Sequence, residues 1–205
     1  MALRYLTAKL AQQIDEELMN AAGAFSIDQG AESREGMFGY TPTIWMPKPG
    51  SKEIYQRLKT QCINMKIPVI APSNDTSSLR DALARSDVVL DAIFGFSFKP
   101  PARAPFDVAL PMITESKLPI VSVDIPSGWD VEKGNAEGVG LVPDVLVSLT
   151  APKEGSKGFS GRHFLGGRFV TKAMEEKYSL NLPQYPGFDQ IVELPQSEAS
   201  ATQKL

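Results

Sequence analysis

Apolar residues recur along the chain in two patterns, either four residues apart or in short unbroken runs. A four-residue spacing places side chains on one face of a helix. It predicts an amphipathic helix over 6–22 that ends near Gly23, and a second helix with Ser51 as its N-cap. The buried face of the second helix would consist of Ile54, Leu58, Cys62 and Met65.

The short apolar runs alternate with helical segments. Further helices are expected over 78–86 and 105–116, the latter with Phe106, Ala109, Leu110 and Ile113 inward. Strands are expected over 43–46, 67–71, 87–95, 118–125, 144–151 and 166–170. The run "DVVLDAIFG" at 87–95 is apolar almost throughout, which is typical of a strand covered on both faces. Strands alternating with helices over short connections predict an α/β fold with a mainly parallel sheet.

Length and composition place the chain among ordinary globular proteins. Its 205 residues are 42% hydrophobic and 22% charged, so we expect one domain over 1–195 and a disordered tail over 196–205. The net charge of −3 argues against a general nucleic-acid or anionic-membrane surface. No apolar stretch approaches the roughly 20 residues of a membrane helix. The first residues lack the apolar core of a signal peptide, so we expect a cytoplasmic protein.

Polar side chains gather where three of the expected strands end. Asp91 lies near the end of one strand, Asp124 and Ser127 follow another, and Lys153 follows a third. Each has an ordinary explanation, as a cap, a turn residue or a solvated lysine. Because the carboxyl ends of parallel strands share one edge of the sheet, the four together favour a ligand site there.

The single histidine and single cysteine restrict the chemistry further. With only His163 and Cys62 available, a zinc site is not expected. A Cys-His catalytic pair stays open on composition alone, although no motif supports it and Cys62 is in phase with the apolar face of its helix. The chain also has no G-x-G-x-x-G sequence after its first strand, which argues against a dehydrogenase.

Three segments carry a closer resemblance. "LDAIFGFSFKPP", "VSVDIPSGWDVEKG" and "PDVLVSLTAPKEGSKGF" closely resemble the NAD(P)H-hydrate epimerases, also called the YjeF amino-terminal domain. "AFSIDQ" (24–29) and "YPGFDQIVEL" (185–194) are similar as well, so the resemblance covers most of 6–195. It implies a Rossmann-like three-layer sandwich and an isomerase that interconverts the R and S forms of hydrated NADH and NADPH. It also implies K⁺ as cofactor, a separate dehydratase as partner, a homodimer, and a place in the cytosol or mitochondria.

The resemblance also assigns roles to residues. Asp91 and Ser127 match potassium-binding positions, Asp124 matches the substrate-binding acid at the catalytic centre, and Lys153 matches a lysine that borders the same pocket. The segment that matches the dinucleotide contacts comprises Gly95, Phe96, Ser97, Phe98, Lys99, Pro100 and Pro101. These roles suit the chemistry, because potassium prefers carboxylate, hydroxyl and carbonyl oxygens and a loop of backbone N–H groups can hold a diphosphate. Asp124 would deliver and retrieve the proton that epimerisation at C6 requires.

One part of the family pattern is missing. Family members have a central strand, a glycine-rich "NNGGDG" loop and a helix, where this chain has only the eight residues 30–37. We therefore expect a sheet without one central strand and its following helix, and a low stability. A shortened isoform or a gene model without an internal exon is the explanation we favour. Two others stay open: a non-catalytic dinucleotide- or protein-binding member, as animal relatives described as partners of apolipoprotein A-I suggest, or a site in which other groups replace the loop.

Overall fold

The computed structural model describes residues 3–19, 40–48, 50–51, 53–70 and 76–195. The expected tail at 196–205, the shortened region at 30–37 and the "AFSIDQ" segment lie outside these residues, so the expectations about them stay predictions. The helices are α1 (Ala8–Met19), α2 (Glu53–Asn64), α3 (Ser77–Leu83), α4 (Phe106–Ser116), α5 (Lys172–Tyr178) and the 3₁₀ turn η3 (Glu154–Ser156). The strands are β1 (Ile44–Trp45), β2 (Val69–Ile70), β3 (Val89–Asp91), β4 (Ile120–Val123), β5 (Val145–Leu149), β6 (Arg162–Gly166) and β7 (Ile191–Glu193).

The expected α/β fold is confirmed, although some elements were missed and one strand was misplaced. The first four helices and five of the six expected strands fall where the apolar pattern puts them, although most are shorter. The strand expected over 166–170 is wrong, because β6 ends at Gly166 and Gly167 turns the chain with a φ of +80°. Helix α5 and the antiparallel strand β7 were not predicted.

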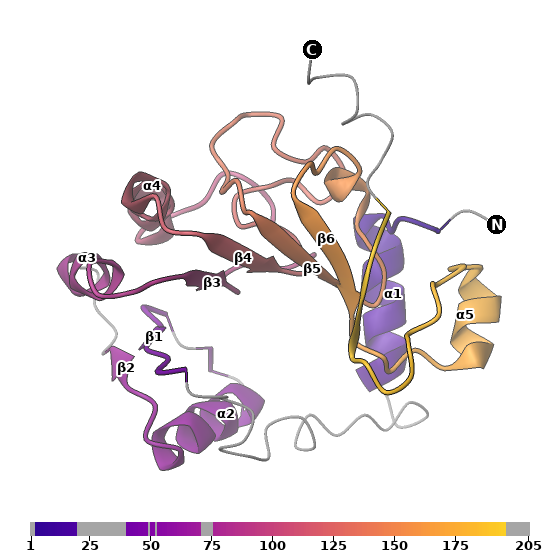
Figure 1. Cartoon of the computed structure of the whole chain (residues 1–205), viewed down its shortest axis with the longest axis horizontal. Coiled ribbons are helices and arrows are strands. Elements are labelled where there is room, and N and C mark those ends of the chain that lie inside the picture. The colour runs from indigo at the N-terminus through magenta and orange to yellow at the C-terminus, as the bar shows by residue number, and fades with distance from the viewer. Residues whose placement is uncertain (1–2, 20–39, 49, 52, 71–75, 196–205) are drawn as a thin grey trace.

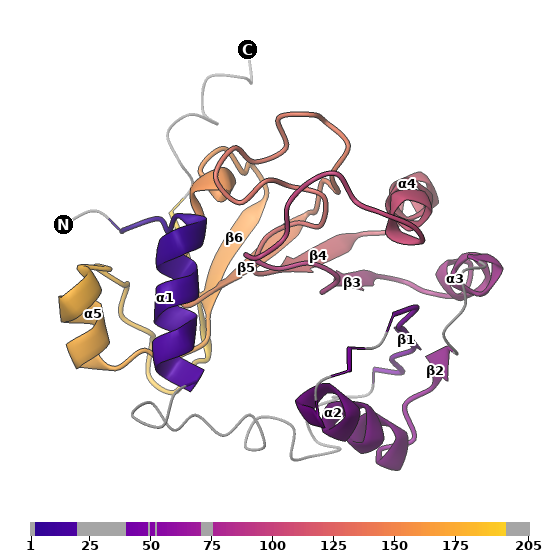
Figure 2. The ribbon, with the colours of Figure 1, turned by 180° about the vertical axis from the view of Figure 1, so that it is seen from behind.

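The strands form two separate sheets. Parallel strands β1 and β2 form the smaller sheet. The larger has the order β3-β4-β5-β6-β7, parallel except for β7. In both ribbon views β1 lies between β2 and β3, and no pairing joins β1 to β3 in the described residues (Figures 1 and 2). A division into two sheets agrees with the expectation that one central strand is missing.

The two faces of the larger sheet differ in burial. On one face Val89 and Ile120 pack with α3 and α4 in a core cluster that includes Ala109, Leu110 and Ile113. On the other face Leu90 is 68% exposed. The expectation that this strand is covered on both faces is therefore wrong. Helix α2 is also less covered than its pattern suggests, because its predicted inward residues are only half-buried.

A second core cluster joins the beginning and the end of the described chain. Leu6 and Ile14 pack with Ala151, Met174 and Leu180, and Phe96 packs against the same cluster. This packing holds α1 and α5 beside the far end of the larger sheet, as the two views show (Figures 1 and 2). No helix in the described ranges is long and apolar enough to cross a membrane.

Candidate active site at the strand ends

Asp124 follows β4 in an unusual backbone conformation. Its φ is +72°, a region that residues other than glycine seldom adopt. The backbone N–H of Asp124 donates to the carbonyl oxygen of Val147 at 2.8 Å, which ties the turn to β5. Non-glycine residues held in this region cluster at functional sites, so the conformation agrees with a chemical role for Asp124.

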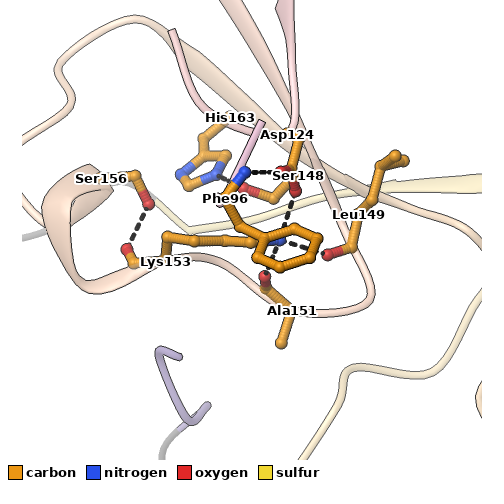
Figure 3. Close-up of polar contacts among 8 residues, drawn as sticks. All are labelled: Phe96, Asp124, Ser148, Leu149, Ala151, Lys153, Ser156 and His163. Carbon is orange, nitrogen blue, oxygen red and sulfur yellow. Dashed lines mark hydrogen bonds and ion pairs between the residues drawn. The ribbon is translucent and has the colours of Figure 1, made fainter. Parts of the chain in front are cut away.

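The carboxylate of Asp124 is held by two donors from opposite sides. Nζ of Lys153 donates to Oδ1, and the backbone N–H of Phe96 donates to Oδ2 at 2.9 Å (Figure 3). Both side chains are largely buried, with exposed fractions of 12% for Asp124 and 3% for Lys153. An ion pair withdrawn from water is held in place more firmly than a surface pair, because water screens it less.

Lys153 is fixed by further contacts. Its ammonium group also donates to the carbonyl oxygens of Leu149 at 2.9 Å and Ala151 at 3.3 Å. Its backbone bridges to Leu6, whose carbonyl accepts from the N–H of Glu154 at 2.8 Å. The N-terminal segment therefore helps to position this lysine, and the alternative of a solvated lysine is wrong.

Gly95 lets the loop after β3 approach the carboxylate. A Cβ added at Gly95 would lie 3.1 Å from Oδ2 of Asp124, so a larger residue would press on the carboxylate. The loop is stiffened by the stacked rings of Phe94 and Phe98, whose centroids are 4.1 Å apart. The side chains of Ser97 and Lys99 lie exposed on this loop.

Asp91 lies beside this pair in a separate hydrogen-bonded cluster. Its Oδ1 accepts from Oγ of Ser127 at 2.6 Å and from the N–H of Ile93 at 3.3 Å. Its Oδ2 accepts from Oγ of Ser122 at 2.7 Å and from the N–H of Ser127 at 2.9 Å. Oγ of Ser127 in turn accepts from the N–H of Phe94 at 3.1 Å. Asp91 therefore locks the loop after β3 to the turn after β4.

His163 forms a buried pair of its own. Its Nε2 lies 2.9 Å from Oγ of Ser148, and the ring of Phe159 packs edge-on against the imidazole. Burial lowers the pKa of His163 to about 4, so the imidazole is neutral at physiological pH. Since Cys62 lies on α2 and the partner of His163 is Ser148, the described contacts give no support to a Cys-His pair.

A shallow hollow lies next to the loop. It has a volume of about 230 Å³ and is lined by Pro100 and by residues between 128 and 137, not by Asp124. Of the predicted site residues only Pro100 contributes to it. The contact between Asp124 and Lys153, rather than this hollow, is therefore the candidate site, because the hollow brings no buried reactive group together.

The chain matches known proteins over most of its length. A family profile described as "YjeF-related protein N-terminus" matches residues 34–155. The chain belongs to this family. An NAD(P)H-hydrate epimerase from Cryptococcus neoformans is 45% identical, covering 96% of this chain and all of that protein. One from Puccinia graminis f. sp. tritici is 42% identical over 94% of each chain. The crystal structure of the yeast protein ynu0 has a TM-score of 0.83 and 31% identity, covering 94% of this chain and all of the yeast chain.

The relatives are longer than this YjeF-related chain within the matched region. The alignment with the Cryptococcus protein runs over 251 positions, whereas this chain has only 205 residues, so at least 46 aligned positions have no counterpart here. This number of positions would suffice for one strand, its glycine-rich loop and a helix, the parts that the sequence predicts to be missing.

The structure brings most of the predicted site residues of this YjeF-related chain together. Asp124 and Lys153 are in direct contact, and Phe96 joins them through its backbone. Asp91 and Ser127 form the adjacent cluster. Asp124 and Ser127 also act as an ordinary loop acceptor and turn residue, and the functional roles expected for them stay predictions. Sequence reasoning missed Ser122, whose polar position inside the apolar strand "IVSV" was the available signal.

Proposed function

We propose that this chain is an isomerase that interconverts the R and S forms of hydrated NADH and NADPH. Its relatives carry this activity in their names. The observation that supports it most is the buried contact of Lys153 with Asp124, held at the ends of neighbouring strands by Phe96. In an open α/β sheet, this edge is where ligands bind.

The proposed reaction needs one group that gives up a proton and regains it. The lone pair of the ring nitrogen expels the hydroxyl group from C6, and the proton shared by Asp124 and Lys153 joins the departing oxygen, so that water leaves. Water then adds to the opposite face of the cationic ring, and its excess proton returns to the pair. One C6–O bond breaks and one forms, the proton count is unchanged, and the configuration at C6 is inverted.

Substrate binding is assigned to the loop of residues 95–101. Gly95 and Phe96 border the Asp124 carboxylate, and Lys99 is an exposed residue of the same loop. The cation of Lys99 suits a diphosphate, whereas the N–H groups of Phe96 and Phe98 already donate to Asp124 and to Gly95. The stacked rings of Phe94 and Phe98 give the loop a fixed shape, which reduces the ordering that binding would require.

Potassium does not fit the described residues as they stand. Asp91 and Ser127 have the oxygen atoms that potassium prefers, yet each oxygen of the Asp91 carboxylate already accepts from two protein donors. The side chain is also almost fully buried, with 2% of the residue exposed. We therefore give potassium no step in the reaction.

The remaining expectations follow from the same proposal. A separate dehydratase that accepts one epimer would consume the product, and the cytoplasm or the mitochondrion would be the place of action. No contact among the described residues favours the non-catalytic alternative.

The test is an epimerisation assay on the purified chain. An NADHX epimer mixture is treated with an S-specific dehydratase, and the loss of the remaining R form is followed with and without the chain. The proposal predicts an acceleration over the spontaneous rate. A folded sample that leaves the spontaneous rate unchanged would overturn the proposed function.

A further inference from the structure

The backbone is strained directly after two neighbouring strands of the larger sheet. Asp124 follows β4 with a φ of +72°, and Thr150 follows β5 with a φ of +68°. This region is unfavourable for any residue with a Cβ, and most of all for a β-branched residue such as threonine. Strained residues persist only where the surrounding structure holds them. The turn after β5, which leads to Lys153, therefore needs an anchor.

The N-terminal strap, which we define as residues 4–8, is bonded to this turn. The N–H of Leu6 donates to the carbonyl oxygen of Pro152 at 2.6 Å, and the N–H of Glu154 donates to the carbonyl oxygen of Leu6 at 2.8 Å. The two bonds form a parallel bridge between Leu6 and Lys153. Leu6 is fully buried and packs in the second core cluster. The strap therefore holds the residues on both sides of Lys153.

Both ends of the strap are bonded to other parts of the chain. At one end the N–H of Arg4 donates to the carbonyl oxygen of Leu180, beyond α5, at 2.9 Å. At the other end the N–H of Ala8 donates to Oε1 of Glu132 at 3.3 Å. Because the ends are bonded to two different segments, the strap can keep Leu6 against the turn.

The second core cluster also contacts the segments that carry both donors of the Asp124 carboxylate. Ala151, a member of the cluster, accepts from Nζ of Lys153 through its carbonyl oxygen at 3.3 Å. Phe96 packs against the cluster, and its N–H donates to Oδ2 of Asp124 at 2.9 Å (Figure 3). A loss of packing at Leu6 would therefore reach the hydrogen bonds that hold Asp124.

We propose that Leu6 is a positioning residue of the candidate active site: through it, the N-terminal strap holds the strained turn after β5 in the one conformation that places Nζ of Lys153 on Asp124. Without this anchor the turn would relax at Thr150 and Lys153 would move into water. Only the consequence for turnover rests on the proposed function.

The exposure of Lys153 is measured without substrate, by brief acetylation of the full chain with acetic anhydride followed by mass spectrometry. The side chain of Lys153 is 3% exposed, whereas that of Lys172 is 88% exposed and serves as the internal reference. Leu6→Ala leaves a cavity beside the turn, so we expect Lys153 to react at least about tenfold faster, relative to Lys172, than in the parent. Leu6→Met nearly keeps the volume and should keep Lys153 protected.

Leu79→Ala is the matched control. Leu79 is a buried leucine of α3 in the core cluster that α3 and α4 share, and neither Lys153 nor Phe96 is part of that cluster. Its loss should leave the protection of Lys153 unchanged. Should Leu6→Ala fail to fold, Leu6→Val and Leu79→Val make the same comparison with a smaller loss of volume. Equal reactivity of Lys153 in the two members of a pair would overturn the proposal.

Epimerisation by the same samples tests the proposed function separately. Leu6→Ala should lower kcat/KM in step with the exposure of Lys153, whereas Leu79→Ala should keep the parent value. Absence of turnover by the folded parent would overturn the proposed function, and the acetylation result would still decide whether the strap positions Lys153.

Discussion

Nζ of Lys153 donates a hydrogen bond to Oδ1 of Asp124, although the two residues follow different strands and are 29 positions apart. Two buried charges depend on each other in this arrangement. Removing one leaves the other in a site that water reaches poorly, which costs far more than the loss of an exposed pair. The contact therefore affects stability as well as the proposed chemistry.

The substitution Lys153→Met should lower the free energy of unfolding by about 3–5 kcal/mol, because it leaves the Asp124 carboxylate buried without its cation. Lys157→Met, in which an exposed lysine loses its pairing with Glu154, should change stability by less than about 1 kcal/mol. Urea unfolding compares the two. The double variant Asp124→Asn/Lys153→Met should recover part of the loss, and equal effects of the two single substitutions would contradict a buried pair.

Asp91 provides a second stability test. Asp91→Ala would leave four donors around the carboxylate without their acceptor, so we expect a loss of about 3 kcal/mol or more. Asp107→Ala removes an exposed carboxylate in the first turn of α4 and should cost less than about 1 kcal/mol. Chemical unfolding of both variants measures the difference, and similar values would mean that the Asp91 hydrogen bonds contribute little.

Thermal unfolding in potassium and in sodium salts tests whether the Asp91 carboxylate, which already accepts four hydrogen bonds, also binds potassium. At equal ionic strength the two salts should give the same Tm, because each carboxylate oxygen already accepts from two protein donors. A rise in Tm that is specific to potassium and is lost in Asp91→Asn would show that this side chain binds the cation after all.

The buried imidazole of His163 predicts a dependence of stability on pH. Its pKa falls from 6.5 to about 4 on folding because of burial. Below pH 6.5 the unfolded chain therefore takes up a proton that the folded chain refuses, so stability is complete above pH 6.5 and falls as the pH drops towards 4. Linkage gives a loss of about 2 kcal/mol between pH 7 and pH 5. His163→Gln should remove this part of the pH dependence of the free energy of unfolding, measured in urea. An equal change of this free energy with pH in the parent and the variant would contradict the prediction.

Local patterns in the sequence account for much of this fold. The unbroken apolar run "DVLVSLTA" predicts β5, and the four-residue spacing of Leu6, Leu10 and Ile14 predicts α1. The start of β6 was not predicted, because Arg162 and His163 interrupt its apolar pattern. Long-range contacts fix the positions of these two residues. The exposed Leu90 was missed for a related reason, since the sequence of a strand does not record whether its covering layer is present.

The candidate site was also predicted only in part. The strand-end pattern brings Asp91, Asp124 and Ser127 to one edge, and the structure places them there. The burial of Lys153 could not be predicted, because it depends on the bridge to Leu6 and on carbonyl groups of its own turn. The low stability expected for the shortened chain stays a prediction.

The most direct test of the account compares the epimerisation rates of the parent chain and of Asp124→Asn. The amide keeps the shape and can still accept from Phe96, but it cannot take up and return the proton. The R form remaining after dehydratase treatment should disappear with the variant at least about 100-fold more slowly than with the parent, measured above the spontaneous rate. Asp107→Asn, at an exposed position of α4, should keep the parent rate. A folded Asp124→Asn variant that matches the parent would contradict the role assigned to Asp124.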